Sequence, residues 1–231
     1  MSYGLIVNND SNYIQIDSEK PRLCALYSGT YQATDSRLAT IVFPSPITTV
    51  EPPCIFIQNS PERPDDIYTE MLITGSSGNW TGFTLNTLNV QNRPKGKWFA
   101  SVFGSIGSAS YGLRIWDDSS KIIYDSGAPP VIVTKASQTW QNPNRINMGS
   151  NAFAYVYNNT MVSDISSDEY FMINPFLRSA LVSNVSYYIP AGVKYNWTEK
   201  RLQIYIVTNT QGLVWTDIGA YAGVFARLPG T

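Results

Sequence analysis

Apolar residues in this chain fall in short runs that are rich in Val, Ile, Tyr, Phe and Thr, and each run is bounded by Gly, Pro, Asn, Asp or Ser. β-Branched and aromatic side chains favour strands, and the bounding residues favour turns. Tyr3, Leu5 and Val7 alternate along the first run, so they share the face of a strand that we expect to be buried. The pattern predicts a nearly all-β protein, with the polar segments 61–66 and 162–169 as loops that hold a helical turn at most.

The expected strands are distributed evenly over the two halves of the chain. In the first half they are 3–7, 14–16, 23–26, 38–43, 54–58, 68–73, 83–90 and 98–103. In the second half they are 111–115, 122–124, 131–133, 153–157, 170–173, 186–189, 201–208 and 220–226. Seven or eight short strands in each half indicate an antiparallel β-sandwich.

The two halves also resemble each other in sequence. Tyr3-Gly4-Leu5-x-Val7 returns 108 positions later as Tyr111-Gly112-Leu113-x-Ile115, and Asp17-Ser18 returns at the same spacing as Asp125-Ser126. Phe56 and Asn59 are matched by Phe171 and Asn174. Further matches pair Gly75, Asn79, Trp80, Thr81, Leu85, Val90, Asn92 and Trp98 with Gly192, Asn196, Trp197, Thr198, Leu202, Val207, Asn209 and Trp215. Matches that keep their order along both halves indicate a tandem duplication with insertions in the loops.

We therefore expect two tandem, similar antiparallel β-sandwich domains that arose by internal duplication. The predicted domains are residues 1–107 and 108–231, each of a common domain size. The boundary is placed near Gly107, in the Gly- and Ser-rich segment 104–110. A join of this kind is flexible in isolation, and its shortness also lets two sandwiches pack end to end.

Composition excludes several classes of function. Charged residues make up 14% of the chain and the formal net charge is −1, so nonspecific nucleic-acid binding is not expected. The sequence shows no secretion signal and no apolar run of about 18 residues, so we expect a soluble protein that does not insert into membranes. Cys24 and Cys54 have no cysteine counterparts in the second half, which favours buried free thiols over a disulfide.

The chain contains no histidine, which removes the commonest general base and the commonest zinc ligand. We therefore predict a protein that is not an enzyme, with no catalytic, cofactor-binding or metal site and with its ligand-binding residues unassigned. Carboxylate pairs of a glycosidase are the alternative. The acids considered for that role are Glu62, Asp65, Asp66, Glu70, Asp164, Asp168 and Glu169. Asp10, Asp117 and Asp118 lie in turns and do not show the spacing of a calcium loop.

Tryptophan and tyrosine are the remaining candidates for recognition, as a stacking platform for sugar rings or as anchors of a protein interface. The aromatic residues considered are Trp80, Trp116, Trp140, Trp197 and the Tyr187-Tyr188 pair. Trp80 and Trp98 recur as Trp197 and Trp215, which favours a role in packing. Trp116 stands where the first copy has Asn8, on the strand face that varies, so it is the preferred candidate for a contact surface.

The repeated hairpin 3–18 and 111–126, with its Tyr-Gly-Leu-x-Val/Ile start, Asn/Asp/Ser turn and Asp-Ser end, resembles the opening hairpin of small virion proteins of tailed bacteriophages. Those proteins are tail fibre, tail tip or baseplate components. The resemblance covers about 16 residues in each copy and implies a structural protein of the virion tail, assembled in the host bacterial cytoplasm. The implied partners are further copies of the chain, as a trimer or hexamer, and other tail proteins. Host attachment through a surface glycan or protein is a further role that it implies.

Two alternatives remain at this point. A tandem carbohydrate-binding, lectin-like β-sandwich would use exposed Trp and Tyr side chains against sugars, and a glycosidase domain would need paired acids in a cleft. Assembly state separates the first from a tail component, because fibre and baseplate proteins form closed symmetric oligomers. Amide replacement of the acids tests the glycosidase alternative, because only an enzyme would lose turnover of a glycan.

Overall fold

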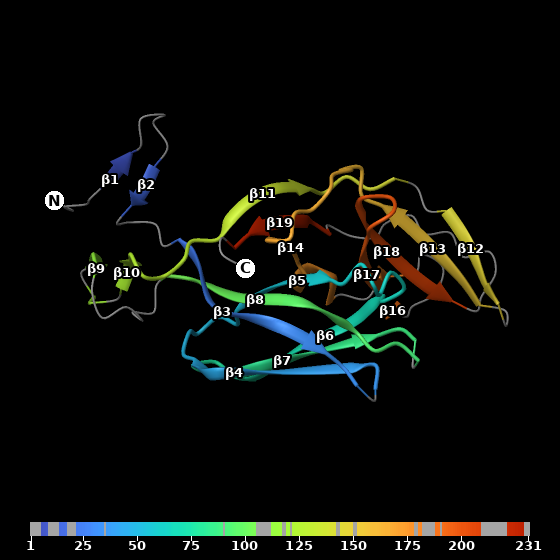
Figure 1. Cartoon of the computed structure of the whole chain (residues 1–231), viewed down its shortest axis with the longest axis horizontal. Helices are drawn as coiled ribbons and strands as arrows, with labels where there is room; N and C mark the ends of the chain where they lie inside the picture. Colours follow the sequence, from blue (N-terminus) through green and yellow to red (C-terminus); the bar gives the residue numbers. More distant parts are fainter. Residues whose placement is uncertain are drawn as a thin grey trace.

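The computed structural model describes residues 6–8, 14–17, 22–34, 36–89, 91–104, 112–116, 119–120, 122–141, 144–149, 152–177, 180–181, 188–189, 191–208 and 221–228. Within these ranges the chain is built from strands, with one 3₁₀ turn, η1 (Asn174–Leu177). Two large antiparallel sheets face each other, and three small hairpins accompany them (Figure 1). The predicted all-β antiparallel sandwich is therefore confirmed.

The first large sheet has six strands, in the order β11 (Ile132–Ser137), β19 (Gly223–Arg227), β14 (Glu169–Met172), β5 (Cys54–Asn59), β8 (Lys95–Phe103) and β3 (Leu23–Gln32). The second has seven, in the order β12 (Asn144–Gly149), β13 (Ala152–Asn158), β18 (Arg201–Thr208), β17 (Ala191–Asn196), β6 (Tyr68–Ser76), β7 (Asn79–Thr87) and β4 (Leu38–Ile47). The hairpins are β1 (Ile6–Asn8) with β2 (Ile14–Asp17), β9 (Arg114–Trp116) with β10 (Ile122–Asp125), and β15 (Ala180–Leu181) with β16 (Tyr188–Ile189).

Both large sheets run through both halves of the chain. In the six-stranded sheet Ile57 of β5 pairs with Phe171 of β14, and in the seven-stranded sheet Tyr68 of β6 pairs with Val193 of β17. Outward from this junction, the first half contributes β5, β8 and β3 where the second contributes β14, β19 and β11. This equal outward order of β5, β8, β3 and of β14, β19, β11 is the order that an approximate twofold axis at the junction produces. The duplicated halves are thus joined side by side through their strands, and the segment 105–110, which holds the boundary proposed from the sequence, lies outside the described residues.

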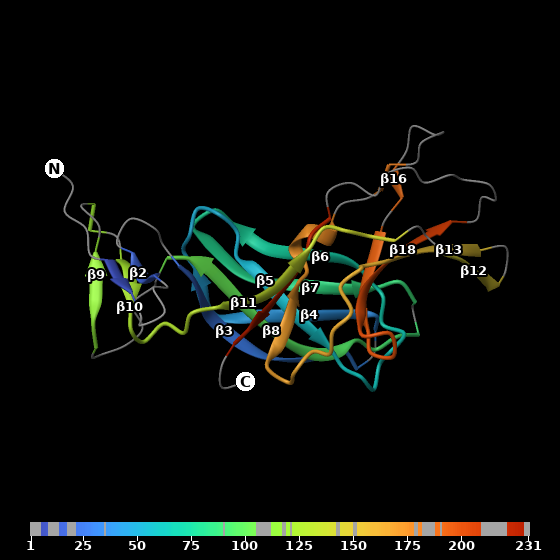
Figure 2. The ribbon, with the colours of Figure 1, turned by 90° about the horizontal axis from the view of Figure 1, so that it is seen from above.

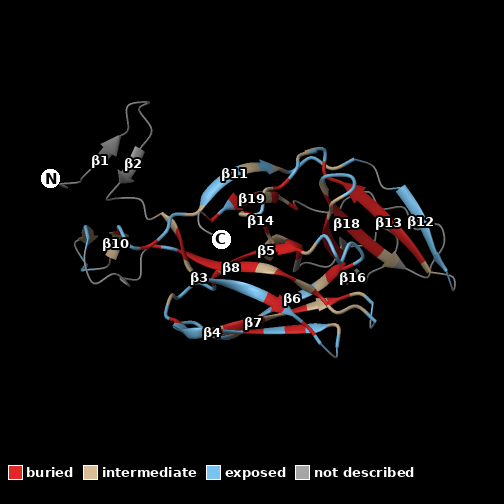
Figure 3. Cartoon of the chain, in the orientation of Figure 1, coloured by how far each residue is buried: buried red, intermediate tan, exposed pale blue. Residues whose placement is uncertain are grey.

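The main hydrophobic core fills the space between the two sheets (Figure 3). Leu85 and Leu202, which match in the sequence repeat, are both fully buried in it, on β7 and β18. Aromatic rings dominate the part that the first half contributes, where Trp98 lies 5.3 Å from Phe83 and 5.9 Å from Phe43 between ring centroids. One continuous core therefore serves both copies of the repeat.

The six-stranded sheet curls until its two edges meet at one end. The main-chain N–H of Val131, just before β11, donates to Leu23 O on β3, and the N–H of Ala25 donates to Pro129 O. The curled face encloses a second apolar cluster, in which Phe56 stacks on Phe99 at 4.5 Å between centroids. Because the sheet is covered on both faces, β5 is apolar along most of its length instead of alternating.

Both cysteines carry free thiols, as predicted. Cys24 is buried on β3 and Cys54 is partly buried on β5. Burial raises the pKa of the Cys54 thiol, which disfavours the reactive thiolate.

Candidate interaction surface

The acids considered for a glycosidase are distributed over separate parts of the fold. Glu62 forms an exposed ion pair with Lys95 at 2.6 Å, and its pKa is lowered by that hydrogen bond. Asp164 forms another with Lys200 at 2.8 Å. Asp168 accepts a hydrogen bond from the Ser166 hydroxyl, which lowers the pKa of its carboxyl. Glu70 accepts a hydrogen bond from Asn86 on the outer side of the seven-stranded sheet, and Asp65 is exposed in the loop before β6.

Glu169 is the best satisfied of these acids. Its carboxylate forms an ion pair with Lys135 at 3.0 Å and accepts a hydrogen bond from the Thr134 hydroxyl. The Lys135 ammonium also donates to Ser163 Oγ at 2.9 Å and lies 4.9 Å from the centre of the Phe225 ring. A buried carboxylate held by a cation and a hydroxyl joins β11 to β14 and is a structural ion pair.

Asp66 differs because one of its carboxylate oxygens is buried without a hydrogen-bond partner. Its residue is only 2% exposed, and burial raises the pKa of its carboxyl. Lys194 is buried nearby on β17, where burial lowers its pKa, and its ammonium donates to Pro64 O at 2.8 Å. Neither residue lines the pocket described below.

No group of three or more His, Cys, Asp or Glu that could hold a metal occurs in the described part of the chain. Asp10, Asp117 and Asp118 lie outside it. The same described residues include no helix that is long and apolar enough to cross a membrane.

Three of the tryptophans considered for recognition are packing residues. Trp80, Trp140 and Trp197 are partly buried against the main core. Their indole N–H groups donate to main-chain carbonyls of Thr49 at 2.9 Å, Tyr221 at 3.0 Å and Asn59 at 3.1 Å. The packing role predicted for Trp80 and Trp197 is confirmed. Trp215 and Tyr187 lie outside the described residues, as does the side chain of Tyr188.

Trp116 is 52% exposed at the end of β9, as its position on the variable face of the repeat suggested. The hairpin that carries it is fixed at its base. Arg114 forms an ion pair with the buried Asp125 at 2.8 Å, and the hydroxyl of Ser126 accepts the N–H of Leu113 at 3.0 Å. The exposed Leu113 and Trp116 are therefore presented on a well-defined scaffold.

The same contacts explain the repeated sequence motif. Gly112 has a φ of 129°, and a Cβ there would lie 2.2 Å from Ser126 Oγ, so the motif needs glycine. Asp125 also accepts the N–H of Gly127 at 2.8 Å, which forms the turn after β10. In the second copy, Gly112, Asp125 and Ser126 are thus residues that close the hairpin, and the side chains between them are left free to vary.

The β9–β10 hairpin lies at one end of the molecule, where β8 ends and β11 begins, and both of these strands carry exposed apolar side chains there (Figures 1 and 2). Phe103 at the end of β8 is 63% exposed and is paired with Leu23, whose carbonyl accepts the N–H of Val131. Ile132 and Val133, which follow Val131 at the start of β11, are exposed as well. We call Phe103, Leu113, Trp116, Ile132 and Val133 the hairpin-end surface.

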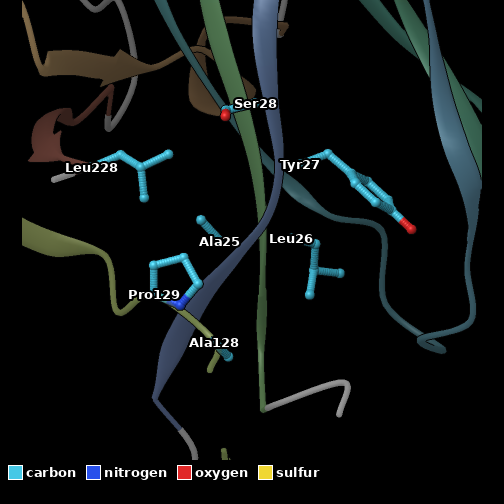
Figure 4. A pocket seen from close by; sticks show the side chains of 7 residues that line it. All are labelled: Ala25, Leu26, Tyr27, Ser28, Ala128, Pro129 and Leu228. Atoms are coloured by element: carbon cyan, nitrogen blue, oxygen red, sulfur yellow. The ribbon is translucent and has the colours of Figure 1, made fainter. Parts of the chain in front are cut away.

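A pocket of about 160 Å³ lies at the same end (Figure 4). A register shift between Ala25 and Tyr27 interrupts the regular pairing of β3 with β8 at this point. The pocket is lined by Ala25, Leu26, Tyr27, Ser28, Ala128, Pro129 and Leu228. Because none of these side chains is charged, the pocket suits a small apolar group better than a charged substrate.

Comparison of the chain with protein-family models, with curated proteins and with solved structures finds no match.

Proposed function

We propose that this protein is a non-enzymatic structural component of a bacteriophage tail, belonging to the tail fibre, tail tip or baseplate. It assembles with copies of itself and with other tail proteins, and it contributes to host attachment as part of that assembly. The observation that carries the proposal is the hairpin-end surface, since its Leu113 and Trp116 belong to the hairpin that resembles phage virion proteins.

The energetics of this surface suit a permanent contact. Burying an exposed apolar side chain of this size contributes roughly 1.5–3 kcal/mol, and Trp and Phe are frequent anchors of protein interfaces. The chain also carries little charge, so few charged groups would have to be desolvated on assembly.

The alternatives find less support. A glycosidase needs two carboxyl groups facing one cleft, whereas Glu62, Asp164 and Glu169 are each held in separate ion pairs. A lectin-like module needs exposed aromatic faces, and the indoles of Trp80, Trp140 and Trp197 are held against the core. Trp116 is the described tryptophan with a largely exposed side chain, so sugar binding would depend on it.

Light scattering of the full chain over a range of concentrations tests the proposal. We expect a stable trimer or hexamer for the natural chain and weaker association for Trp116→Ser and Phe103→Ser. Leu72→Ser is the matched control, because Leu72 is similarly exposed but lies on β6 away from the hairpin end. Purified particles of the phage that encodes this chain should contain it.

The contrary result is also well defined. A chain that stays monomeric alone and with purified tail proteins, and that binds a glycan in a manner lost in Trp116→Ser, would support the carbohydrate-binding module instead. Turnover of a glycan that disappears on amide replacement of Glu62, Asp66 or Glu169 would contradict the non-enzymatic assignment.

A further inference from the structure

β12 is the least covered strand of the two large sheets. It forms one edge of the seven-stranded sheet, hydrogen-bonds to β13 on one side, and has all six of its residues exposed. Its two large apolar side chains, Ile146 and Met148, are exposed as well. A strand with both faces in solvent gains little from packing within its own chain.

The other edges of the large sheets are protected over part of their length. β4, at the opposite edge of the same sheet, contains Pro44 and Pro46 and loses its regular pairing with β7 between Val42 and Ile47. Proline removes hydrogen-bond donors and blocks edge pairing. The edges β3 and β11 of the six-stranded sheet meet at one end, where the N–H of Val131 donates to Leu23 O.

Residues 144–147 of β12 carry none of these protective features, and the register with β13 shifts only between Asn147 and Gly149. It has no proline, and its single charged residue, Arg145, lies over the Phe153 ring at 4.0 Å from its centroid. Counted outward from the junction of β6 and β17, the third strand is β4 in the first half and β13 in the second. The sheet ends at β4, so β12, the fourth strand of the second half, has no counterpart in the first. β12 is thus an addition to the duplicated plan.

We propose that β12 is a docking strand for β12 of a second copy of this chain, which pairs with it antiparallel across a twofold axis and joins the two seven-stranded sheets. The inference deepens the proposed function, on which it rests, by naming one interface of the self-assembly. An antiparallel twofold pair must place one residue opposite itself, because directly opposed residues point to the same side of a sheet.

Ile146 is the residue that we place on this axis. It pairs with Ala154 of β13, which belongs to a small apolar cluster on the outer side of the sheet, so the two Ile146 side chains would extend that apolar surface. The register then sets Arg145 opposite Asn147 of the other copy. Centring the axis on Arg145 would instead oppose two positive charges, which is unfavourable. Chemical self-complementarity therefore favours a second copy as the occupant.

Cysteine cross-linking tests both the partner and the register. Under mild oxidation Ile146→Cys should form a covalent dimer, because directly opposed residues of paired strands lie within disulfide reach. Val42→Cys is the matched control: Val42 is more exposed, at 74%, but lies on the protected edge strand β4. The natural chain, with Cys24 and Cys54 present, measures the background.

Hydrogen exchange tests the same pairing in the unmodified protein. Amide exchange in 144–149 should slow about tenfold or more as the protein concentration rises, because pairing protects main-chain N–H groups. In Ile146→Lys this protection should be lost, whereas Val42→Lys should keep it. Melting temperatures of both lysine variants close to that of the natural chain would show that the fold is intact.

The outcomes separate this inference from the proposed function. A rise in mass with concentration, without protection of 144–149 and without cross-linking of Ile146→Cys, would overturn the strand pairing and leave assembly through the hairpin end in place. Cross-linking and protection in a protein that is absent from phage particles would support the strand pairing and contradict the tail assignment. Equal cross-linking of Ile146→Cys and Val42→Cys would also overturn the inference.

Discussion

The side-chain amide of Asn59 hydrogen-bonds to both main-chain polar groups of Tyr195, 136 residues away. Asn59 Nδ2 donates to Tyr195 O at 3.2 Å, and Asn59 Oδ1 accepts the N–H of Tyr195 at 3.3 Å. Asn174 makes the converse contact: its side chain accepts the N–H of Ile55 at 2.6 Å and donates to Pro53 O at 3.2 Å. The two asparagines that match in the sequence repeat thus each bind the main chain of the opposite half.

Replacing Asn59 by alanine should lower the free energy of unfolding by about 2–3 kcal/mol, because two hydrogen bonds are lost and buried main-chain groups are left unsatisfied. Asn59 is fully buried, so water cannot substitute for the amide. Chemical denaturation measures the change. Asn89→Ala, in an exposed turn, is the control, and an equal effect of the two variants would contradict this role for Asn59.

The chain should unfold in one cooperative transition, because the paired Ile57 and Phe171 belong to different halves of one sheet. Phe83→Ala in the first half and Ile206→Ala in the second remove fully buried side chains, at a cost of about 2–5 kcal/mol each. Both variants should shift the same calorimetric peak. Two peaks, of which each variant moves only its own, would show that the halves unfold independently.

Breaking the Lys135–Glu169 ion pair should be costly. Glu169→Gln leaves a largely buried ammonium without its counter-charge, for which a loss of about 3–5 kcal/mol is typical, whereas the double variant Lys135→Met/Glu169→Gln should recover much of it. The exposed pair of Lys200 and Asp164 supplies the control. Lys200→Met should cost no more than about 1 kcal/mol in denaturant titrations.

Asp66 should make the protein less stable as the pH rises from acid to neutral. Burial raises the pKa of its carboxyl above the ordinary value of 3.8, so between these pKa values the folded state binds more protons than the unfolded state. The stability that neutral Asp66 permits is present below the unfolded pKa and is lost as the pH rises through the folded one. Asp66→Asn should therefore raise the melting temperature at neutral pH and have a smaller effect in acid. The exposed Asp65→Asn is the control, and a lower melting temperature of Asp66→Asn at neutral pH would contradict this account.

Alkali should unfold the protein through its buried tyrosines. Burial raises the pKa values of Tyr31, Tyr68 and Tyr205 and brings that of Tyr195 to about 12, while the ordinary value is 10.0. Folded chains therefore retain protons that unfolded chains release, and stability is lost as the pH rises above 10.0. Phenolate absorbance of these residues should appear together with the loss of near-ultraviolet circular dichroism. Ionisation that precedes unfolding would contradict the prediction.

Some predictions from the sequence were incomplete for identifiable reasons. The strand β12 was not expected, because Asn144, Arg145 and Asn147 lack the apolar alternation that marks a half-buried strand. The strand expected at 83–90 begins earlier, at Asn79, since the hairpin that β7 forms with β6 extends to its tip. The largely apolar β5 was recognised as a strand, but its burial on both faces depends on the curling of the sheet.

Local sequence determined the elements of this protein and one feature of its surface. Alternation such as Ala39, Ile41 and Phe43 specifies which face of β4 is buried, since side chains in a strand point to opposite faces in turn. The substitution of Asn8 by Trp116 between the copies likewise indicated an exposed position.

Only the tertiary structure decided how the elements meet. The pairing of β5 with β14, the ion pair that buries Glu169 and the uncovered edge at β12 all join or separate residues that are distant in the chain. A strand's own alternation shows which face is apolar, but its hydrogen-bonding edge is the same repeating main chain in every strand. The choice of neighbour therefore depends on how all the strands pack together, and no local pattern contains it.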